Sequence, residues 1–595
     1  MNSIKYKSRR LEYNYLLLLV LCIFFLSCLY YYPFISDDSL ISLRYAKRFI
    51  EGKGLTWNDG SPVEGYSNLL WILGVSALGK LGFDLMIATR ILGILCSLGI
   101  LGVILFYFKS QGSKIQYIYY AMLLFVTTPC VAVWAVGGLE QPLYIFFITL
   151  MIIEVSVIIN KKNFERIYLL SLWLGLLALT RPDGYLFTIL TSVFLLVFNF
   201  RDRKLFLKIV FSVILIPSLF LLGQLVFRYN YYGELVPNTA LVKVKITLHH
   251  ILRGGYYNFK AFLGTLLLSA LGFLCLYYLV FKKKNLFGLY LLLCTMAWMS
   301  YITLIGGDIF PAFRHYYVVL IFLVFSIITG LEHSNKIDFS ITKTRVFFFI
   351  LLISSVCIQV FIPANQYAKD ERWEFDGMHL GNRLKNIFPN NTLIAVTAAG
   401  CIPYFSELPT VDMLGLNDYF LARNPPSNFG NGALAHELGD ANYVMRRNPD
   451  LIIFGTGSEL NFNIGDQLKE NMIFKTNYIK VLAKDNVNQY IMFINKYGKN
   501  AGIKLKDNQL TIPGYLFENK RDALILLKGN SIYKEFKSGE TYSIEIDNKE
   551  ISYTKFKDIF SENSLIKTKI IYHEKSTEIH MIAKKDTLIE NLLFR

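Results

Sequence analysis

Two adjacent carboxylates, Asp37 and Asp38, stand where the first apolar run of this 595-residue chain ends. Ionisable side chains at a membrane boundary are energetically costly, so a pair of acids there indicates a functional site. A structural explanation competes with this one, because Ser36 could cap a helix whose first turn favours acidic residues. Arg44 lies seven residues after Asp37, a spacing that puts both on one face if the segment is helical.

Similar polar clusters follow later apolar runs, and they contain residue types that can bind a phosphate or move a proton. A carboxylate can accept the proton of an attacking hydroxyl, and a cation can neutralise a phosphate leaving group. Taken singly, most of these clusters also fit a turn or a helix cap. The candidates are Glu64, Tyr66 and Asn68 in the first loop, Glu140 in GGLEQP, Arg181 and Asp183 in RPDG, Asn238 and Lys243 in PNTALVK, and Asp308, Arg314 and His315 in GGDIFPAFRH.

The elements that must position these residues are membrane-spanning helices. Hydrophobic residues make up 54% of the chain, and apolar runs near the roughly 20 residues of a membrane span dominate it up to about residue 363. The first run is too long for a signal peptide and is expected to remain uncleaved. The shorter run Leu69–Leu81 is expected to be an interfacial helix within a first outer loop, residues 34–85. We expect about eleven spans, at 15–33, 86–108, 115–135, 141–159, 167–181, 185–199, 205–227, 260–281, 286–304, 316–331 and 345–363.

The formal net charge of +17 does not indicate a nucleic-acid partner, because much of the basic excess lies in short loops between apolar runs. Such a bias marks cytoplasmic loops. It predicts a cytoplasmic N-terminus, an extracytoplasmic C-terminal domain, and an outer location for all the polar clusters above. The basic loops carry Lys109 and Lys114, Lys161, Lys162 and Arg166, Arg201, Arg203 and Lys204, Lys282 to Lys284, and Lys336, Lys343 and Arg345.

Acids and cations gathered on one face of a membrane domain suit a reaction between a lipid-borne phosphate and a polar acceptor. If the donor is a polyprenyl-phosphate sugar, its tail can stay in the bilayer while its head group reaches the outer loops. A transporter or flippase of a lipid-linked saccharide is the alternative, although it should place charges within spans and show related halves. A non-catalytic scaffold that displays its outer domain is a second alternative, and it leaves the clustered carboxylates unexplained.

The segment DDSLISLRYAKRFIEGKGLTWNDGSPVEGYSNLLW resembles the opening of the GT-C membrane glycosyltransferases. Within them it is most similar to the branch of the mycobacterial terminal β-(1→2) arabinofuranosyltransferase and its bacterial relatives. The resemblance continues through GGLEQPLY, RPDG, PNT, GGD, Gly400–Asp418 and His436–Glu437, and so covers roughly residues 36–455. It implies transfer, with inversion, from a polyprenyl-phosphate-linked sugar to a cell-envelope glycan or glycolipid on the outer face of the bacterial inner (plasma) membrane. Because the chain is rich in Lys, Ile and Asn, an arabinan substrate is not assumed.

The resemblance also implies roles for single residues. Asp37 and Asp38 match the acidic pair, and one of them would be the catalytic base; Asp37 is favoured as the first acid, but the sequence does not separate them. No cofactor is indicated, although a divalent cation that bridges phosphate and carboxylates is compatible with this chemistry. Arg44 would orient the acid or touch phosphate. The pocket would be lined by Glu64, Glu140, Asp183 and Asp308, and the phosphate candidates are Lys243, Arg314 and His315. The substrate-binding set is completed by Tyr66, Asn68, Arg181 and Asn238.

The predicted fold is therefore a polytopic α-helical membrane domain, residues 1–363, followed by an outer α/β subdomain, 364–485, and an outer β-rich subdomain, 486–595. Alternating short strands and helices indicate the α/β layer, and later short strands fit a small β-sandwich. Cys401 is the cysteine that falls clearly in this polar part, so an internal disulfide cannot hold it. Strands are expected at Leu393–Thr397, Leu451–Phe454, Gln489–Ile494, Ala523–Leu527, Thr541–Ile546 and Thr577–Ile582, with helical structure over 431–447.

Overall fold

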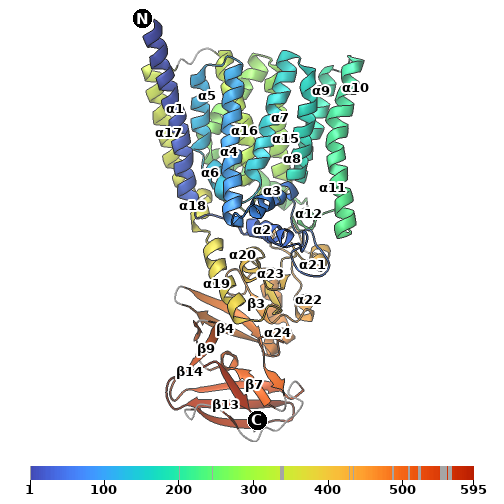
Figure 1. The fold of residues 1–595 in the computed structure, drawn as a ribbon, viewed down its shortest axis with the longest axis vertical. Helices are drawn as coiled ribbons and strands as arrows, with labels where there is room; N and C mark the ends of the chain where they lie inside the picture. The colour runs from blue at the N-terminus through green and yellow to red at the C-terminus, as the bar shows by residue number, and fades with distance from the viewer. Residues whose placement is uncertain are drawn as a thin grey trace. The chain divides into compact units, whose positions relative to one another are not determined.

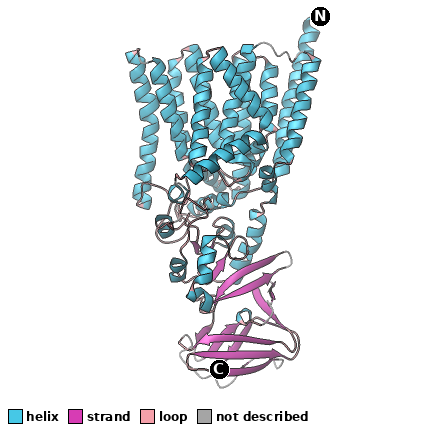
Figure 2. Cartoon of the chain, turned by 180° about the vertical axis from the view of Figure 1, so that it is seen from behind, coloured by secondary structure: helices cyan, strands magenta, loops and turns pink. Residues whose placement is uncertain are grey.

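The chain forms two compact units in the computed structural model. The first consists of Met1–Thr56, Tyr66–Arg372 and Gly430–Leu434, and the second of Trp57–Gly65, Trp373–Phe429 and Ala435–Arg595. Helices build the first unit, and the described strands all lie in the second (Figures 1 and 2). The described residues are 2–199, 201–243, 246–334, 339, 341–427, 429–432, 434–485, 488–506, 509–519, 524–528, 530–549, 559–560 and 566–594.

Apolar helices form the bulk of the first unit. By length and composition, seven of the described helical segments can cross a membrane, and two bent pairs raise this number to nine if each pair is one span. The predicted polytopic helical part with a β-rich C-terminal part is confirmed, whereas the count of eleven spans and their orientation stay predictions. The helices are α1 (Asn2–Tyr31), α2 (Asp37–Ile50), α3 (Leu69–Lys80), α4 (Leu85–Ser110), α5 (Ile115–Val126), α6 (Pro129–Val136), α7 (Gln141–Lys161), α8 (Ile167–Thr180), α9 (Tyr185–Asn199), α10 (Arg203–Ile209), α11 (Ile216–Tyr232), α12 (Asn238–Lys243), α13 (Leu248–Gly264), α14 (Leu266–Tyr277), α15 (Leu286–Leu304), α16 (Tyr317–Ser334), α17 (Thr342–Val360) and α18 (Pro363–Asp370).

Two predicted spans differ from the structure. The predicted span 115–135 is two helices, α5 and α6, bent by 65° at Thr127–Thr128, because Pro129 lacks an amide hydrogen and restricts the residue before it. The predicted span 260–281 begins inside α13, which meets α14 at 101°. Hydropathy alone does not identify α13, because polar residues occupy one of its faces.

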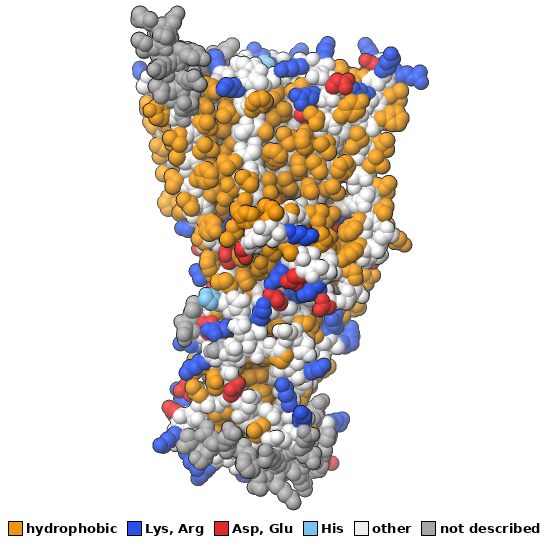
Figure 3. All heavy atoms as spheres, in the orientation of Figure 1, with side chains coloured by type: hydrophobic (Ala, Val, Ile, Leu, Met, Phe, Trp, Pro, Cys, Tyr) orange, Lys and Arg blue, Asp and Glu red, His pale blue; other side chains and the backbone are white. Residues whose placement is uncertain are grey.

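The centre of the first unit is α16. All its residues from Tyr317 to Leu331 are buried, and it packs against α5, α7, α14 and α15. By contrast, α17 exposes most of its apolar side chains, among them Phe347, Ile350 and Ile353, as expected of a helix that faces lipid. On the face seen in Figure 3, the surface of the bundle is mainly hydrophobic between its two ends.

The second unit is built on an eight-stranded sheet of order β14-β9-β8-β4-β5-β3-β1-β2, in which β1 pairs in parallel with β2 and β3. This sheet includes strands from both sides of residue 485. Two smaller sheets follow, of order β10-β13-β12 and β11-β15-β7-β6. The strands are β1 (Ile394–Val396), β2 (Thr410–Asp412), β3 (Leu451–Ile453), β4 (Tyr478–Lys484), β5 (Gln489–Asn495), β6 (Lys504–Lys506), β7 (Gln509–Pro513), β8 (Leu524–Lys528), β9 (Ser531–Phe536), β10 (Thr541–Asp547), β11 (Ile559–Phe560), β12 (Ile566–Tyr572), β13 (Ser576–Ala583), β14 (Thr587–Ile589) and β15 (Asn591–Phe594).

The six predicted strands overlap β1, β3, β5, β8, β10 and β13, and Ala523, the predicted start of the fourth, lies outside the described residues. The helix expected over 431–447 is wrong for most of its length, since among the residues described in that range only Ala441–Arg446 (α22) is helical. Asp440 caps α22 by accepting a hydrogen bond from the Tyr443 amide at 3.0 Å, and Gly439 before it has φ +141°, so the helix begins only at Ala441. The other helices of this unit are α19 (Trp373–Ile387), α20 (Cys401–Ser406), α21 (Tyr419–Arg423), α23 (Phe462–Glu470) and α24 (Met472–Asn477).

Candidate active site

The acidic pair forms the first turn of α2. Asp37 and Asp38 are half-exposed, whereas the residues from Ser39 to Ala46 behind them are buried. Ser36 is the N-cap residue, but within the described residues its side chain makes no capping hydrogen bond. Capping by Ser36 therefore does not account for the pair, and two accessible carboxylates lie at the start of an otherwise buried helix.

A turn of two glycines holds this helix start against the beginning of α7. The amide of Ser36 donates to the carbonyl of Gly137 at 3.1 Å. Gly138 has φ +84°, and a Cβ there would lie 2.7 Å from Oγ of Ser39, so only glycine permits this approach. The Gly138 carbonyl also accepts hydrogen bonds from Trp71 Nε1 at 3.0 Å and Thr89 Oγ1 at 2.9 Å. The GGLEQP segment is thereby fixed to α2, α3 and α4.

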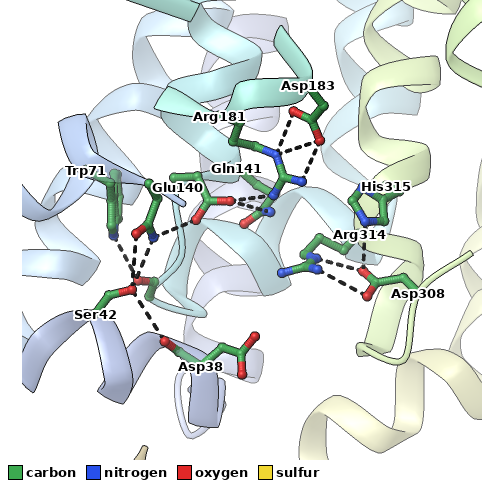
Figure 4. Close-up of polar contacts among 12 residues, drawn as sticks. Asp38, Ser42, Trp71, Glu140, Gln141, Arg181, Asp183, Asp308, Arg314 and His315 are labelled. Carbon is green, nitrogen blue, oxygen red and sulfur yellow. Dashed lines mark hydrogen bonds and ion pairs between the residues drawn. The ribbon is translucent and has the colours of Figure 1, made fainter. Parts of the chain in front are cut away.

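A continuous chain of polar contacts runs from α2 to the end of α8 (Figure 4). Oγ of Ser42 donates to the main-chain carbonyl of Asp38 at 3.4 Å, and Asn68 Nδ2 donates to the same Oγ at 3.2 Å. Asn68 Nδ2 also donates to Glu140 Oε2 at 2.9 Å. Arg181 Nη1 donates to Glu140 Oε1 at 2.6 Å. These contacts bring Asn68, Glu140 and Arg181 together beside the acidic pair.

Arg181 also binds Asp183 in a bidentate arrangement. Its Nη2 lies 2.7 Å from Asp183 Oδ2 and its Nε lies 3.0 Å from Oδ1, the geometry of strong charge-assisted pairs. The hydroxyl of Tyr301, on α15, donates to Asp183 Oδ2 at 3.0 Å. Glu140 is 3% exposed and the side chain of Asp183 is 7% exposed. All three nitrogens of the Arg181 guanidinium thus serve two buried carboxylates.

A second cluster precedes α16. Arg314 donates through Nε to Asp308 Oδ2 at 2.7 Å and through Nη2 to Oδ1 at 3.1 Å, and His315 Nε2 lies 3.8 Å from Asp308 Oδ2. Ala312 and Phe313 have φ of +53° and +54°, an uncommon backbone conformation that turns the chain sharply before Arg314. Nη1 of Arg314 points away from Asp308, toward the side of Glu140 and Arg181 (Figure 4). The carboxylate of Asp38 points toward the side of Arg314 and Asp308 in the same view.

The other predicted site residues lie elsewhere. Tyr66 is buried, and its hydroxyl shares a 3.0 Å hydrogen bond with that of Tyr232. Arg44 is buried on α2 and Asn238 begins α12, also buried. Lys243 ends α12, and its side chain lies outside the described residues. Glu64 is buried and belongs to the second unit.

Three contributors were absent from the predicted set: Ser42, Gln141 and Tyr301. Ser42 lies one turn after Asp38 on α2, a spacing that helical periodicity could have selected. Gln141 donates through Nε2 to Glu140 Oε1 at 3.2 Å and stands within the GGLEQP motif. Tyr301 lies near the end of an apolar span, where the sequence gives no signal for a polar contact. No three His, Cys, Asp or Glu side chains gather in a metal-binding arrangement within the described ranges.

In the second unit, the segment Gly400–Asp418 contains α20 and β2 and ends in a tight turn that begins at Asp412, the last residue of β2. Its carboxylate accepts hydrogen bonds from the amides of Leu414 at 3.0 Å and Asn417 at 2.8 Å, and from Asn417 Nδ2 at 3.1 Å. Burial raises the pKa of Asp412 to about 6, against the opposing effect of these hydrogen bonds. A Cβ on Gly65 would lie 2.0 Å from Asn417 Oδ1. The turn therefore fits closely against the residue that follows Glu64.

Comparisons with known proteins relate the chain to glycosyltransferases. A terminal β-(1→2)-arabinofuranosyltransferase of Mycobacterium tuberculosis is 25% identical over 222 residues, 35% of this chain and 35% of the relative. One from Corynebacterium glutamicum is 26% identical over 335 residues, 46% of this chain and 45% of the relative. The chain thus spans less than half the length of these curated relatives. Residues 364–501 match a family model described as a domain of unknown function (DUF8728).

Solved structures establish the fold. The crystal structure of ArnT from Cupriavidus metallidurans in the apo state superposes with a TM-score of 0.54 at 11% identity, covering 82% of this chain and 98% of ArnT. The same protein bound to undecaprenyl phosphate gives a TM-score of 0.52 at 11% identity, covering 80% and 97%. The predicted resemblance to the GT-C superfamily and its arabinofuranosyltransferase branch is confirmed.

Proposed function

We propose that this relative of the terminal β-(1→2)-arabinofuranosyltransferases is an inverting glycosyltransferase. It moves a sugar from a polyprenyl-phosphate-linked donor to a cell-envelope glycan or glycolipid on the outer face of the bacterial inner membrane. The observation that carries the proposal is the half-exposed Asp37–Asp38 pair at the start of α2. The main-chain carbonyl of Asp38 is linked through Ser42 and Asn68 to Glu140, and Glu140 binds Arg181. Support for a lipid-linked donor comes from the fold shared with ArnT, a protein crystallised with undecaprenyl phosphate.

In the proposed reaction the acceptor hydroxyl attacks the anomeric carbon of the donor. The bond from that carbon to the phosphate oxygen breaks, and the polyprenyl phosphate leaves with the electron pair. Asp37 or Asp38 takes the acceptor proton as general base. Attack from the face opposite the leaving group inverts the anomeric configuration.

The two arginines would have different parts in this reaction. Arg181 is occupied by Glu140 and Asp183, so it positions carboxylates. Arg314 uses Nε and Nη2 for Asp308, and its Nη1 points away from that carboxylate (Figure 4). Arg314 is therefore the better candidate to bind the phosphate, where a fixed cation stabilises the charge that develops on the leaving group.

The direct test replaces each acid of the pair in the full-length protein. Asp37→Asn and Asp38→Asn are compared with Glu51→Gln, an exposed acid that follows the last turn of α2. Transfer from polyprenyl-phosphate sugars is measured in membranes that contain equal amounts of each variant. We expect the base variant to lose roughly 10²–10⁴-fold in rate, with normal abundance, while Glu51→Gln keeps its activity. Full activity in both Asp variants would show that neither is the base.

The outer-face location is tested separately. Lys161, Lys282 and Lys283 lie at the helix ends opposite the Glu140–Arg181 chain, and Lys and Arg side chains line that end of the bundle (Figure 3). The positive-inside bias supports the proposal that this is the cytoplasmic end. A reporter that is active only outside the cytoplasm, fused after residue 370, should be active. Activity of a cytoplasmic reporter at that position would invert the proposed topology.

A further inference from the structure

A polar cavity in the second unit has no part in the reaction described above. Its volume is about 370 Å³, which is near the lower end of the roughly 300–1,000 Å³ of small-molecule sites. One side of it is formed by β4, which contributes the consecutive residues Ile479 to Leu482. The lining consists of Glu459, Ile479, Lys480, Val481, Leu482, Ile491, Tyr515, Glu518, Asn519 and Lys534.

Lys534 is the unusual member of this lining. The side chains of β9 alternate between half-buried and buried, and Lys534 occupies a buried position between Ile532 and Phe536. A lysine at such a core position is rare, because burying an ammonium is costly. Burial lowers the pKa of Lys534 to about 8, and the nearby Glu518 opposes this shift. A plain structural role would favour an apolar residue here.

The contacts of Lys534 leave hydrogen-bonding capacity for a ligand. Its Nζ donates to the carbonyl of Phe517 and lies 5.9 Å from the ring centre of Tyr542. An ammonium has three donors, and the described residues provide one hydrogen-bond acceptor. Lys534 lines the cavity, so a ligand there could accept from the other two donors.

The remaining walls combine charge balance with apolar surface. Two ammonium groups, Lys480 and Lys534, face two carboxylates, Glu459 and Glu518, and Lys480 forms a 2.5 Å ion pair with Glu459. A pocket that contains equal numbers of both charges favours a neutral ligand over a strongly charged one. The hydroxyl of Tyr515 is engaged with the carbonyl of Ala501 at 2.7 Å, so its ring serves as a wall.

We propose that this cavity binds a neutral saccharide of one or two residues. Its hydroxyls would bind Lys534, Glu518 and Asn519, and its C–H faces would lie on Val481, Leu482 and Tyr515. We further identify this saccharide as part of the acceptor glycan, and only this identification rests on the proposed function. Saccharide binding itself requires no glycosyl transfer.

The test is saccharide binding by the full-length protein in a detergent without a sugar head group. The probes are arabinose, galactose, glucose, rhamnose, lactose and maltose. Their binding is detected by saturation-transfer nuclear magnetic resonance, and the affinity is measured by titration. Lys534→Met should weaken the binding of the preferred probe at least tenfold while the melting temperature holds or rises, because methionine suits a core position. Lys484→Met, an exposed lysine on β4 outside the cavity lining, should bind as the wild type does.

Two results would overturn the proposal: no binding of any probe to the wild type, or unchanged affinity in Lys534→Met. If Lys534→Met does not fold, Glu518→Gln decides, since a tenfold loss supports the site and unchanged affinity refutes it. Binding in the Asp37→Asn and Asp38→Asn variants separates the two proposals. A saccharide that still binds to these variants supports the cavity, whatever their transfer activity.

Discussion

Replacing Arg181 by methionine tests whether the buried ion pairs organise the candidate site. Arg181→Met removes the partner of Glu140 at 2.6 Å and of Asp183 at 2.7 Å, and both carboxylates stay buried. Breaking a buried ion pair from one side costs roughly 3–5 kcal/mol, because a charge is left without compensation. We expect a loss of this size in the free energy of unfolding, together with a loss of transfer activity.

A charge-free variant separates the cost of stranded charges from the cost of a lost side chain. The combined variant carries Glu140→Gln, Arg181→Met and Asp183→Asn. It leaves no buried charge without a partner, so it should regain most of the free energy of unfolding that Arg181→Met loses. Transfer activity should stay lost, because the acids and the cation that organise the site are gone. Recovered stability without recovered activity is the expected pattern.

The assay is thermal unfolding of the full-length protein in detergent at one fixed scan rate, since such unfolding is irreversible. The single variant should lower the apparent melting temperature by roughly 2–6 °C, given the small shift per kcal/mol in a protein of this size. Lys208→Met is the control, because its pair with Glu165 at 2.7 Å is largely exposed on the Glu165 side and such pairs contribute little. Two results would refute the reasoning: an Arg181→Met variant that is as stable as the wild type, or a combined variant that is less stable than Arg181→Met.

Two further variants test the supports of the site. Gly138→Ala should cost roughly 1–3 kcal/mol of stability and lower transfer at least tenfold, because its Cβ would meet Oγ of Ser39. Gly112→Ala is the control for backbone strain, since Gly112 has φ +78° and open space around it. Equal effects of the two substitutions would contradict the steric argument. For Asp412, a pKa raised from 3.8 to about 6 means that the folded chain keeps a proton that the unfolded chain loses. Its contribution to stability should therefore fall as pH rises from about 4 to about 6, by about 3 kcal/mol, and Asp412→Asn should flatten the pH dependence of the melting temperature relative to the exposed Asp466→Asn. An identical pH slope in both variants would argue against a raised pKa.

Local signals in the sequence predicted the elements that carry the site. Charge and hydropathy placed Asp37 and Asp38 at the start of a helix, and α2 begins at Asp37. The motifs with Glu140 and Arg181 were both selected, but spacing along the chain could not show that they bind each other. Such pairing depends on the packing of α7 against α8, which involves residues 41 positions apart.

Other features could not be predicted from the sequence, because they depend on tertiary contacts. The bend of 101° between α13 and α14 is not marked by hydropathy, since the sequence is apolar through the end of α13 and all of α14. The assignment of Trp57–Gly65, with Glu64, to the second unit could not be foreseen either. In that segment Asn58 Nδ2 donates to the carbonyl of Thr410 at 2.6 Å, a partner 352 positions away in the chain.

The complete enclosure of α16 has a consequence for the biogenesis of the molecule. A helix without a lipid-facing side gains its stability from neighbouring helices, so it depends on their prior presence in the bilayer. Its main partners α5, α7, α14 and α15 all precede it in the chain, and the ribosome therefore delivers α16 after the helices that contact it most. Arg314 and His315 directly precede α16, so truncations that end before residue 311 would remove both this helix and these two residues while leaving its four main partners in place.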